Sequence, residues 1–168
     1  MVYVITGGPG FGKTTLVKLL ADRHFPVCQE NARSLLTTGG KFNIPADFER
    51  TVATYRANFL QQTDSSVIAF SDRGLPDQVG YSKYKKREPS FFLEEMVKAN
   101  RYASTVFNTP PWKEIYVKDQ IRQENFDQAV AIHDEIVKAY LQYHYKIINL
   151  PLVNPEERVQ FLLNFLGI

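Results

Sequence analysis

The feature that most constrains this chain is a glycine-rich segment close to its N-terminus. Its residues are, in order, Gly7, Gly8, Pro9, Gly10, Phe11, Gly12, Lys13 and Thr14. They fit the pattern of a phosphate-binding loop: a glycine, four residues of any type, then glycine, lysine and serine or threonine. An apolar run at 2–6 precedes the segment, and Leu16, Val17, Leu19 and Leu20 follow it at helical spacing. This order of strand, loop and helix is the one such a loop requires.

Each residue type in this loop has a physical role. The glycines let backbone N–H groups converge on phosphate oxygens, and the helix that follows points its positive end at the same place. We expect Lys13 to reach the β- and γ-phosphates and the Thr14 hydroxyl to bind Mg²⁺, with Thr15 in the same nucleotide-binding set. A glycine-rich structural turn is the alternative, but a turn would not require lysine followed by threonine. The loop therefore predicts that ATP, or another nucleoside triphosphate, binds as its magnesium complex.

Short apolar runs alternate with helical sequence along the rest of the chain. Expected strands are 2–6, 26–29, 66–71, 104–108 and 146–150. Expected helices are one after the loop, 46–62, a broken stretch at 77–86, 90–101, about 120–143, and one that begins at Pro155 behind an Asn154 cap. Such alternation predicts an α/β fold, a parallel sheet with helices on both faces. With 168 residues, 44% of them hydrophobic, and no linker-like segment, 1–168 is expected to be a single domain.

Composition gives more information about the location and partners of the protein than about its reaction. A net charge of +2 gives no support to a nucleic-acid partner or an acidic membrane surface. The single cysteine, Cys28, excludes an internal disulfide and a cysteine-cluster metal site. There is no signal-peptide pattern and no run of 18 apolar residues. We expect a cytoplasmic protein without a membrane span, and we expect no metal site at His24, His133 or His144, which lack ligand spacing. The oligomeric state is not predicted.

Asp72 directly follows the expected strand 66–71, at the carboxyl edge of the sheet where ligands bind in such folds. We expect it to be the second magnesium partner, directly or through water; an aspartate that caps a turn is the alternative. Motor-type ATPases usually carry a glutamate in the next position, whereas this chain has Arg73. That difference disfavours a fast ATP-hydrolysing machine.

The second expected strand leads to Glu30 and Arg33 at the same edge. Glu30 could accept a proton from a substrate hydroxyl, and Arg33 could bind an anionic or polar part of that substrate. The alternative is a glutamate favoured by a helix N-terminus and an ordinary surface arginine. Arg73 and Asp77 are assigned to the same substrate-binding side.

Two further segments carry basic residues. Pro110-Pro111-Trp112 leads to Lys118 and Arg122, from which a small helical lid could close over the phosphates, with Arg122 preferred over Lys118. Solvated helix arginines are the alternative. The second segment, Lys83 to Arg87 with Tyr81 and Tyr84, could touch nucleic acid, but a solvated helix end fits better. Nucleic acid is therefore not the expected partner.

Taken with the phosphate loop, four runs resemble the small AAA-type NTPases related to ribosylnicotinamide kinase domains and to nucleoside and nucleotide kinases. They are Gln29-Glu30-Asn31-Ala32-Arg33, Asp72-Arg73-Gly74-Leu75-Pro76-Asp77, Pro110-Pro111-Trp112, and Ile115-Tyr116 with Arg122. The resemblance implies a five-stranded parallel sheet of order 2-3-1-4-5 with a mobile lid. It also implies Asp72 near magnesium, Glu30 and Arg33 near the phosphoryl acceptor, and Arg122 in the lid. Since most members of that family lack an established substrate, it indicates the donor better than the acceptor.

The leading hypothesis is a kinase that transfers the γ-phosphoryl group of ATP to a hydroxyl of a small nucleoside-like or other polar metabolite. Its expected catalytic residues are Lys13, Glu30, Asp72 and Arg122. A nucleotide-dependent switch that recruits a partner is the alternative. Asp77-Gln78-Val79-Gly80 spells a GTPase switch motif, but we expect it in a loop after Pro76, and no Asn-Lys-x-Asp motif is present. A nucleic-acid end kinase rests only on the Lys83 to Arg87 segment.

Overall fold

The computed structural model of the chain describes residues 1–29, 45–117 and 124–168 and contains a five-stranded sheet of order β2-β3-β1-β4-β5. The strands are β1 (Val2–Thr6), β2 (Val27–Cys28), β3 (Ala69–Asp72), β4 (Thr105–Asn108) and β5 (Lys146–Asn149). Every neighbouring pair is parallel. This confirms the predicted fold class and strand order, although β2 and β3 are shorter than the apolar runs that predicted them.

The register brings the carboxyl ends of the central strands to one edge. Ile5 of β1 lies opposite Asp72 of β3 and Phe107 of β4, and Thr6 lies opposite Asn108. The segment that follows β1 and the segment that follows β3 therefore leave the sheet side by side.

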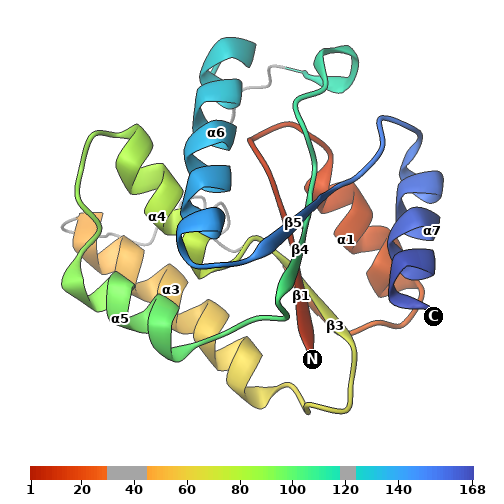
Figure 1. The fold of residues 1–168 in the computed structure, drawn as a ribbon, viewed down its shortest axis with the longest axis horizontal. Coiled ribbons are helices and arrows are strands. Elements are labelled where there is room, and N and C mark those ends of the chain that lie inside the picture. The colour runs from red at the N-terminus through yellow and green to blue at the C-terminus, as the bar shows by residue number, and fades with distance from the viewer. Residues whose placement is uncertain (30–44, 118–123) are drawn as a thin grey trace.

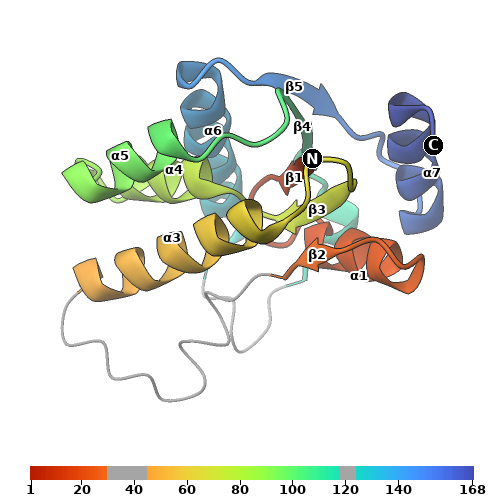
Figure 2. The same ribbon diagram turned by 90° about the horizontal axis from the view of Figure 1, so that it is seen from below.

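Helices cover both faces of this sheet, as Figures 1 and 2 show. They are α1 (Lys13–Asp22), α3 (Pro45–Gln62), α4 (Leu75–Tyr84), α5 (Phe91–Ala99), α6 (Phe126–Gln142) and α7 (Pro155–Leu166), with a short 3₁₀ helix η1 (Lys113–Ile115). Because successive strand residues point to opposite faces, Val2 and Val4 pack under α3 to α6, whereas Ile5 packs under α1 and α7. Among the described helices, none has the length and apolar composition needed to cross a bilayer.

Two helix predictions were wrong in detail. The long helix expected from about 120 begins at Phe126, because Asn125 and Gln128 form a capping box that fixes its first turn. The stretch 77–86, expected to be broken, is one continuous helix, α4, as far as Tyr84, with Pro76 in the first turn, where its missing N–H is tolerated. Asp77 to Gly80 therefore lie on a helix and not in a loop.

Gly80 lies inside α4 at a position where the packing of α4 against α6 leaves no room for a side chain. A Cβ atom at this position would lie 2.5 Å from Cα of Ile136, so the backbones of α4 and α6 approach closely here. The helix gives up some intrinsic propensity in exchange for this packing. The contact anchors α4, which carries Asp77, against α6.

Candidate active site

The glycine-rich loop connects β1 to α1 at the carboxyl edge of the sheet. Gly7, Gly10 and Gly12 all have positive φ angles, of 135°, 84° and 88°. A Cβ atom on Gly7 would lie 2.3 Å from Oγ1 of Thr109, the residue after β4. Thr109 in turn donates its backbone N–H and its hydroxyl to Thr6 O, at 2.8 and 3.0 Å. The loop conformation thus needs glycine, and β4 holds its base in place.

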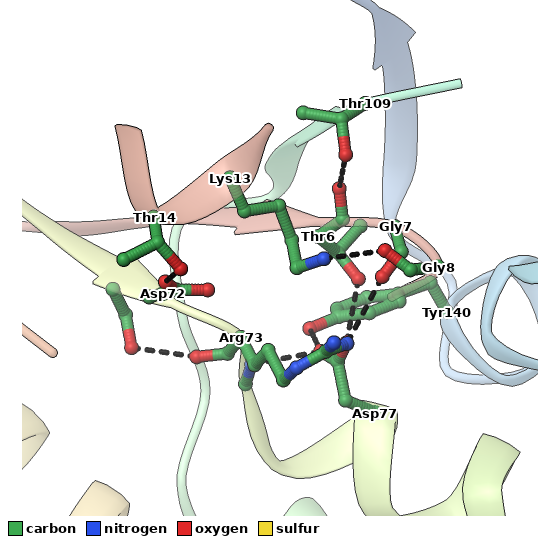
Figure 3. Close-up of polar contacts among 12 residues, drawn as sticks. Thr6, Gly7, Gly8, Lys13, Thr14, Asp72, Arg73, Asp77, Thr109 and Tyr140 are labelled. Carbon is green, nitrogen blue, oxygen red and sulfur yellow. Dashed lines mark hydrogen bonds and ion pairs between the residues drawn. The ribbon is translucent and has the colours of Figure 1, made fainter. Parts of the chain in front are cut away.

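The Lys13 ammonium group lies over this loop. Its Nζ atom donates to Gly8 O at 2.6 Å, and the side chain is buried (Figure 3). Gly8 is itself tightly enclosed, since a Cβ atom there would lie 2.5 Å from the Phe11 ring and 2.6 Å from Ala129 O. A positive charge is therefore fixed where the backbone N–H groups of the loop converge.

Thr14 and Asp72 form the second polar contact at this edge. The Thr14 hydroxyl donates to Oδ2 of Asp72 at 3.0 Å, joining the first turn of α1 to the end of β3 (Figure 3). A hydroxyl and a carboxylate are hard oxygen ligands of the kind that Mg²⁺ prefers. Within the described part of the chain, no group of three or more His, Cys, Asp or Glu side chains could hold a metal by itself. The pair thus fits an ion that takes its remaining ligands from phosphate and water.

Asp77 is the hub of a buried network next to the loop. Its Oδ1 atom accepts from the Thr6 hydroxyl at 2.8 Å and from Arg73 at 3.1 Å. Its Oδ2 atom accepts from the Gly74 N–H at 2.8 Å and from the Tyr140 hydroxyl at 2.5 Å. Both oxygens are therefore engaged, and the side chain has no solvent exposure.

Arg73 connects this hub to the loop. Its backbone is left-handed, with a φ of 73°, a costly conformation for a residue other than glycine and one that occurs at functional sites. Its guanidinium group donates to Gly7 O at 2.9 Å as well as to Asp77, and it lies 5.3 Å from the centre of the Tyr81 ring. Asp77 thus holds a strained arginine against the phosphate loop (Figure 3).

A pocket of about 460 Å³ opens beside the loop. Its walls are Pro9, Gly10, Gly12, Lys13, Thr14, Thr15, Leu16, Arg73, Trp112, Ile115, Val153, Asn154, Pro155 and Arg158. One side is thus the phosphate loop with the start of α1, and the other is made by the segment around η1 and by the start of α7. The Trp112 segment, expected near a lid, lines this pocket.

Sequence reasoning missed Arg158. Only 1% of this residue is exposed, and it donates to Phe11 O at 3.2 Å and to Pro151 O at 2.8 Å. Its guanidinium carbon lies 5.2 Å from the centre of the Trp112 ring, and burial lowers its pKa. Its Nη2 atom has no hydrogen-bond partner among the described residues. The available signal was weak: a basic residue next to the apolar positions of α7.

A second polar network supports the loop from behind. The Asn108 amide donates to Asn149 Oδ1 at 2.9 Å and lies 3.1 Å from Nε2 of His133. Since the amide nitrogen can only donate, His133 is neutral here, with its Nδ1 proton directed at Asp134, 3.1 Å away. Burial lowers the pKa of His133, and the Lys13 charge adds to this effect.

Some of the predicted site residues lie together in the structure, and the others fall outside the residues that it describes. The loop from Gly7 to Thr15, Asp72, Arg73 and Asp77 gather at one edge of the sheet. Glu30 and Arg33, expected near the acceptor, and Lys118 and Arg122, expected in the lid, lie outside the described residues.

Comparison with known proteins agrees with this fold. The sequence profile of the AAA domain family matches residues 2–158. No curated protein sequence matches the chain. A thymidylate kinase from Ehrlichia chaffeensis is similar in structure, with a TM-score of 0.67, 14% identity, and coverage of 99% of this chain and 98% of the other.

Two further solved structures are similar over nearly the whole chain. The deoxyadenosine kinase from M. mycoides with dCMP and dCDP has a TM-score of 0.70 and 13% identity, covering 99% of this chain and 98% of its own. The NadR protein in complex with NR has a TM-score of 0.74 and 18% identity, and the match covers 99% of this chain and 51% of NadR. At these identities the likeness shows a shared fold.

Proposed function

Because this chain belongs to the AAA domain family, we propose that it is a magnesium-dependent kinase that transfers the γ-phosphoryl group of ATP to a hydroxyl of a small nucleoside-like or other polar metabolite. The observation that carries the proposal is the gathering of Lys13 and the Thr14–Asp72 pair around one phosphate loop. Phosphoryl transfer needs little beyond such positioning and charge neutralisation.

The charges buried around the site favour a polyanionic ligand. Among the described residues they comprise the cations Lys13, Arg56, Arg73 and Arg158 and the anions Asp72 and Asp77. Positive groups outnumber negative ones in a place where unbalanced charge is costly. In the proposed complex Lys13 gives up Gly8 O for β- and γ-phosphate oxygens. Lys13 and Arg73, the two cations that contact the loop, would then meet counter-charge on the phosphates.

The Thr14 hydroxyl and the Asp72 carboxylate would hold magnesium, directly or through water. When bound, the ion would supply positive charge that offsets the negative charge developing on the transferred phosphoryl group. The chain's own part is to keep these two oxygen groups 3.0 Å apart at the end of β3 and the start of α1.

The pocket beside the loop is the proposed place for the nucleotide base. Trp112 and Ile115 on one wall and Val153 to Pro155 on the other offer apolar surface to a flat ring, and Arg158 lies over Trp112. Trp112 is the single tryptophan of the chain, so its fluorescence should report on nucleotide binding.

On the acceptor side we retain Glu30 as the group that orients the attacking hydroxyl, Arg33 as an acceptor contact and Arg122 as the closing cation, each proposed from the sequence. Arg73 is proposed to face the transferring group from the loop. For Asp77 we propose a positioning role in place of a substrate contact, because both of its oxygens already accept hydrogen bonds from the protein. The names thymidylate kinase and deoxyadenosine kinase among the structural neighbours support an acceptor of nucleoside or nucleotide kind.

The test is ADP production with Mg²⁺ and ATP across a panel of nucleosides, nucleotides, ribosylnicotinamide and other small hydroxyl compounds. At least one compound should raise the turnover of the native protein by orders of magnitude, and no compound should do so for Lys13→Ala. Tight triphosphate binding that no compound converts into turnover would contradict the kinase and favour the nucleotide-dependent switch.

A further inference from the structure

Arg56 is a buried cation that neither the loop nor the nucleotide pocket uses. It lies on α3 in the buried stripe formed with Val52, Ala53 and Ala57, and only 5% of it is exposed. Its guanidinium group donates to Gly74 O at 3.1 Å, the single acceptor that it contacts among the described residues. An arginine has five N–H donors, so one carbonyl group leaves most of them unmatched.

No acidic side chain of the described residues forms an ion pair or hydrogen bond with Arg56, whose contact among them is with Gly74 O. The groups whose ionisation it influences include the Cys28 thiol and the phenol groups of Tyr102 and Tyr140. Burial raises the pKa of each of the three, so all are neutral at physiological pH. A buried cation among neutral groups is expensive unless a partner of opposite charge completes the site.

Tyr102 adds a second donor without an acceptor. It approaches the same turn as Arg56, since a Cβ atom on Gly74 would lie 3.1 Å from its ring. The backbone N–H of Leu75 approaches its phenol oxygen, but the buried hydroxyl donates to no acceptor among the described residues. The neighbouring Tyr140 hydroxyl is already used, because it donates to Asp77 at 2.5 Å. Arg56 and Tyr102 therefore flank Gly74 as a charged and a neutral donor in need of an oxygen acceptor.

The position of this pair indicates what it binds. Gly74 follows Asp72 and Arg73 directly, so the pair contacts the same Asp72-Arg73-Gly74 turn that carries the proposed magnesium ligand Asp72. We propose that Arg56 and Tyr102 bind an oxyanion of the phosphoryl acceptor, and that the substrate of this chain is therefore an anionic hydroxyl compound and not a neutral one. This inference rests on the proposed function. A guanidinium fork suits phosphate and carboxylate alike, so the shared chemistry is a planar or tetrahedral oxyanion.

Binding separates this inference from turnover. The protein is saturated with Mg²⁺ and a non-hydrolysable ATP analogue and titrated calorimetrically with nucleoside 5′-monophosphates and their parent nucleosides, and with small hydroxy acids and their amides. At least one anion should bind ten or more times more tightly than its neutral counterpart. The phosphate and carboxylate arms then identify which oxyanion the site takes.

Variants test whether Arg56 and Tyr102 cause the preference for an anion over its neutral counterpart. Arg56→Met should abolish the difference between anion and neutral counterpart, Arg56→Lys should restore part of it, and Tyr102→Phe should reduce it several-fold. Arg50→Met, on an exposed part of the same helix, should leave it unchanged, and thermal unfolding of each variant separates loss of binding from loss of fold. Equal binding of anions and neutral compounds, no binding of any anion, or an unchanged preference in Arg56→Met would overturn the proposal. Anion binding without ADP production would instead refute the kinase and leave the oxyanion site standing.

Discussion

Lys13 and Arg56 are both buried cations near the carboxyl edge of the sheet, and each donates to a backbone carbonyl oxygen, Gly8 O for Lys13 and Gly74 O for Arg56. Lys13 belongs to an eight-residue segment that lies in one loop and one helix turn. Arg56 comes from a helix far along the chain and meets Tyr102 only through the fold. The proposed donor half of the site, around Lys13, is thus local in sequence, whereas the proposed acceptor half, around Arg56, is assembled from distant segments.

This difference determines how each half responds to change. In the donor half, the backbone of the loop depends on glycines such as Gly7 and Gly8, where a Cβ atom would clash. The loop backbone in turn holds the Lys13 ammonium group through Gly8 O. In the acceptor half, side chains from α3, from α6 and from the segment before β4 converge on the single turn at Gly74. Asp77 joins the halves, because its network runs from Thr6 of β1 to Gly74.

The largest expected effect lies in the donor half. Lys13→Ala removes the cation that stabilises charge on the transferring phosphoryl group, and turnover should fall about 10²- to 10³-fold. Steady-state ADP release with a stimulating acceptor measures this. Lys18→Ala, exposed on the same helix, should match the native protein, and a Lys13→Ala variant of native activity would break the assignment of the donor half.

The next largest effect is expected at Asp77, whose hydrogen bonds connect the two halves of the site. Asp77→Ala leaves the buried Arg73 guanidinium group without its carboxylate, and the free energy of unfolding should fall by about 3 kcal/mol. Tyr140→Phe removes one hydrogen bond to the same carboxylate and should cost about 1 kcal/mol. Urea denaturation measures both. Equal, small losses in the two variants would show that Asp77 is not the hub.

The sequence predicted the local parts of the site better than the parts that the fold assembles from distant segments. The loop, Asp72 and the strand order were predictable, because glycine spacing and alternating apolar runs report local conformation. Arg56 and Arg158 were not, since a basic residue within an amphipathic helix looks the same whether it meets water or a buried turn. The start of α6 was misplaced because the helical periodicity of the sequence continues on the N-terminal side of Asn125, the residue that caps the start of the helix. The buried network of Asp77 could not be predicted, because its partners Thr6 and Tyr140 lie 71 and 63 residues away along the chain.

A smaller effect sharpens the description of the nucleotide pocket. Arg158→Met removes the cation over Trp112 while keeping much of its volume, and affinity for ATP should fall about tenfold. Affinity for inorganic triphosphate, which has no base, should stay the same. Calorimetric titration measures both ligands, and Arg23→Met, in an exposed ion pair with Glu156, serves as the control. An equal loss for the two ligands would place Arg158 on the phosphates.

The smallest effect concerns His133 behind the loop. Since its folded-state pKa is lowered below the ordinary 6.5, the unfolded chain binds the proton more readily. Its contribution to stability is complete above about pH 6.5 and is lost as the pH falls below that value toward the lowered folded pKa. Urea denaturation of the native protein and of His133→Gln across this range should show the difference between them shrinking as acid is added. A difference that is constant with pH would mean that His133 does not titrate in this window.

The central claim is that the donor half delivers a phosphoryl group to a molecule held by the acceptor half. Following γ-labelled ATP in the presence of the acceptor that most stimulates ADP release tests it most directly. We expect label in a phosphate ester of that acceptor, in equal amount to ADP, and about 10²- to 10³-fold slower labelling with Lys13→Ala. Label that appears only as inorganic phosphate, with or without the acceptor, would contradict it.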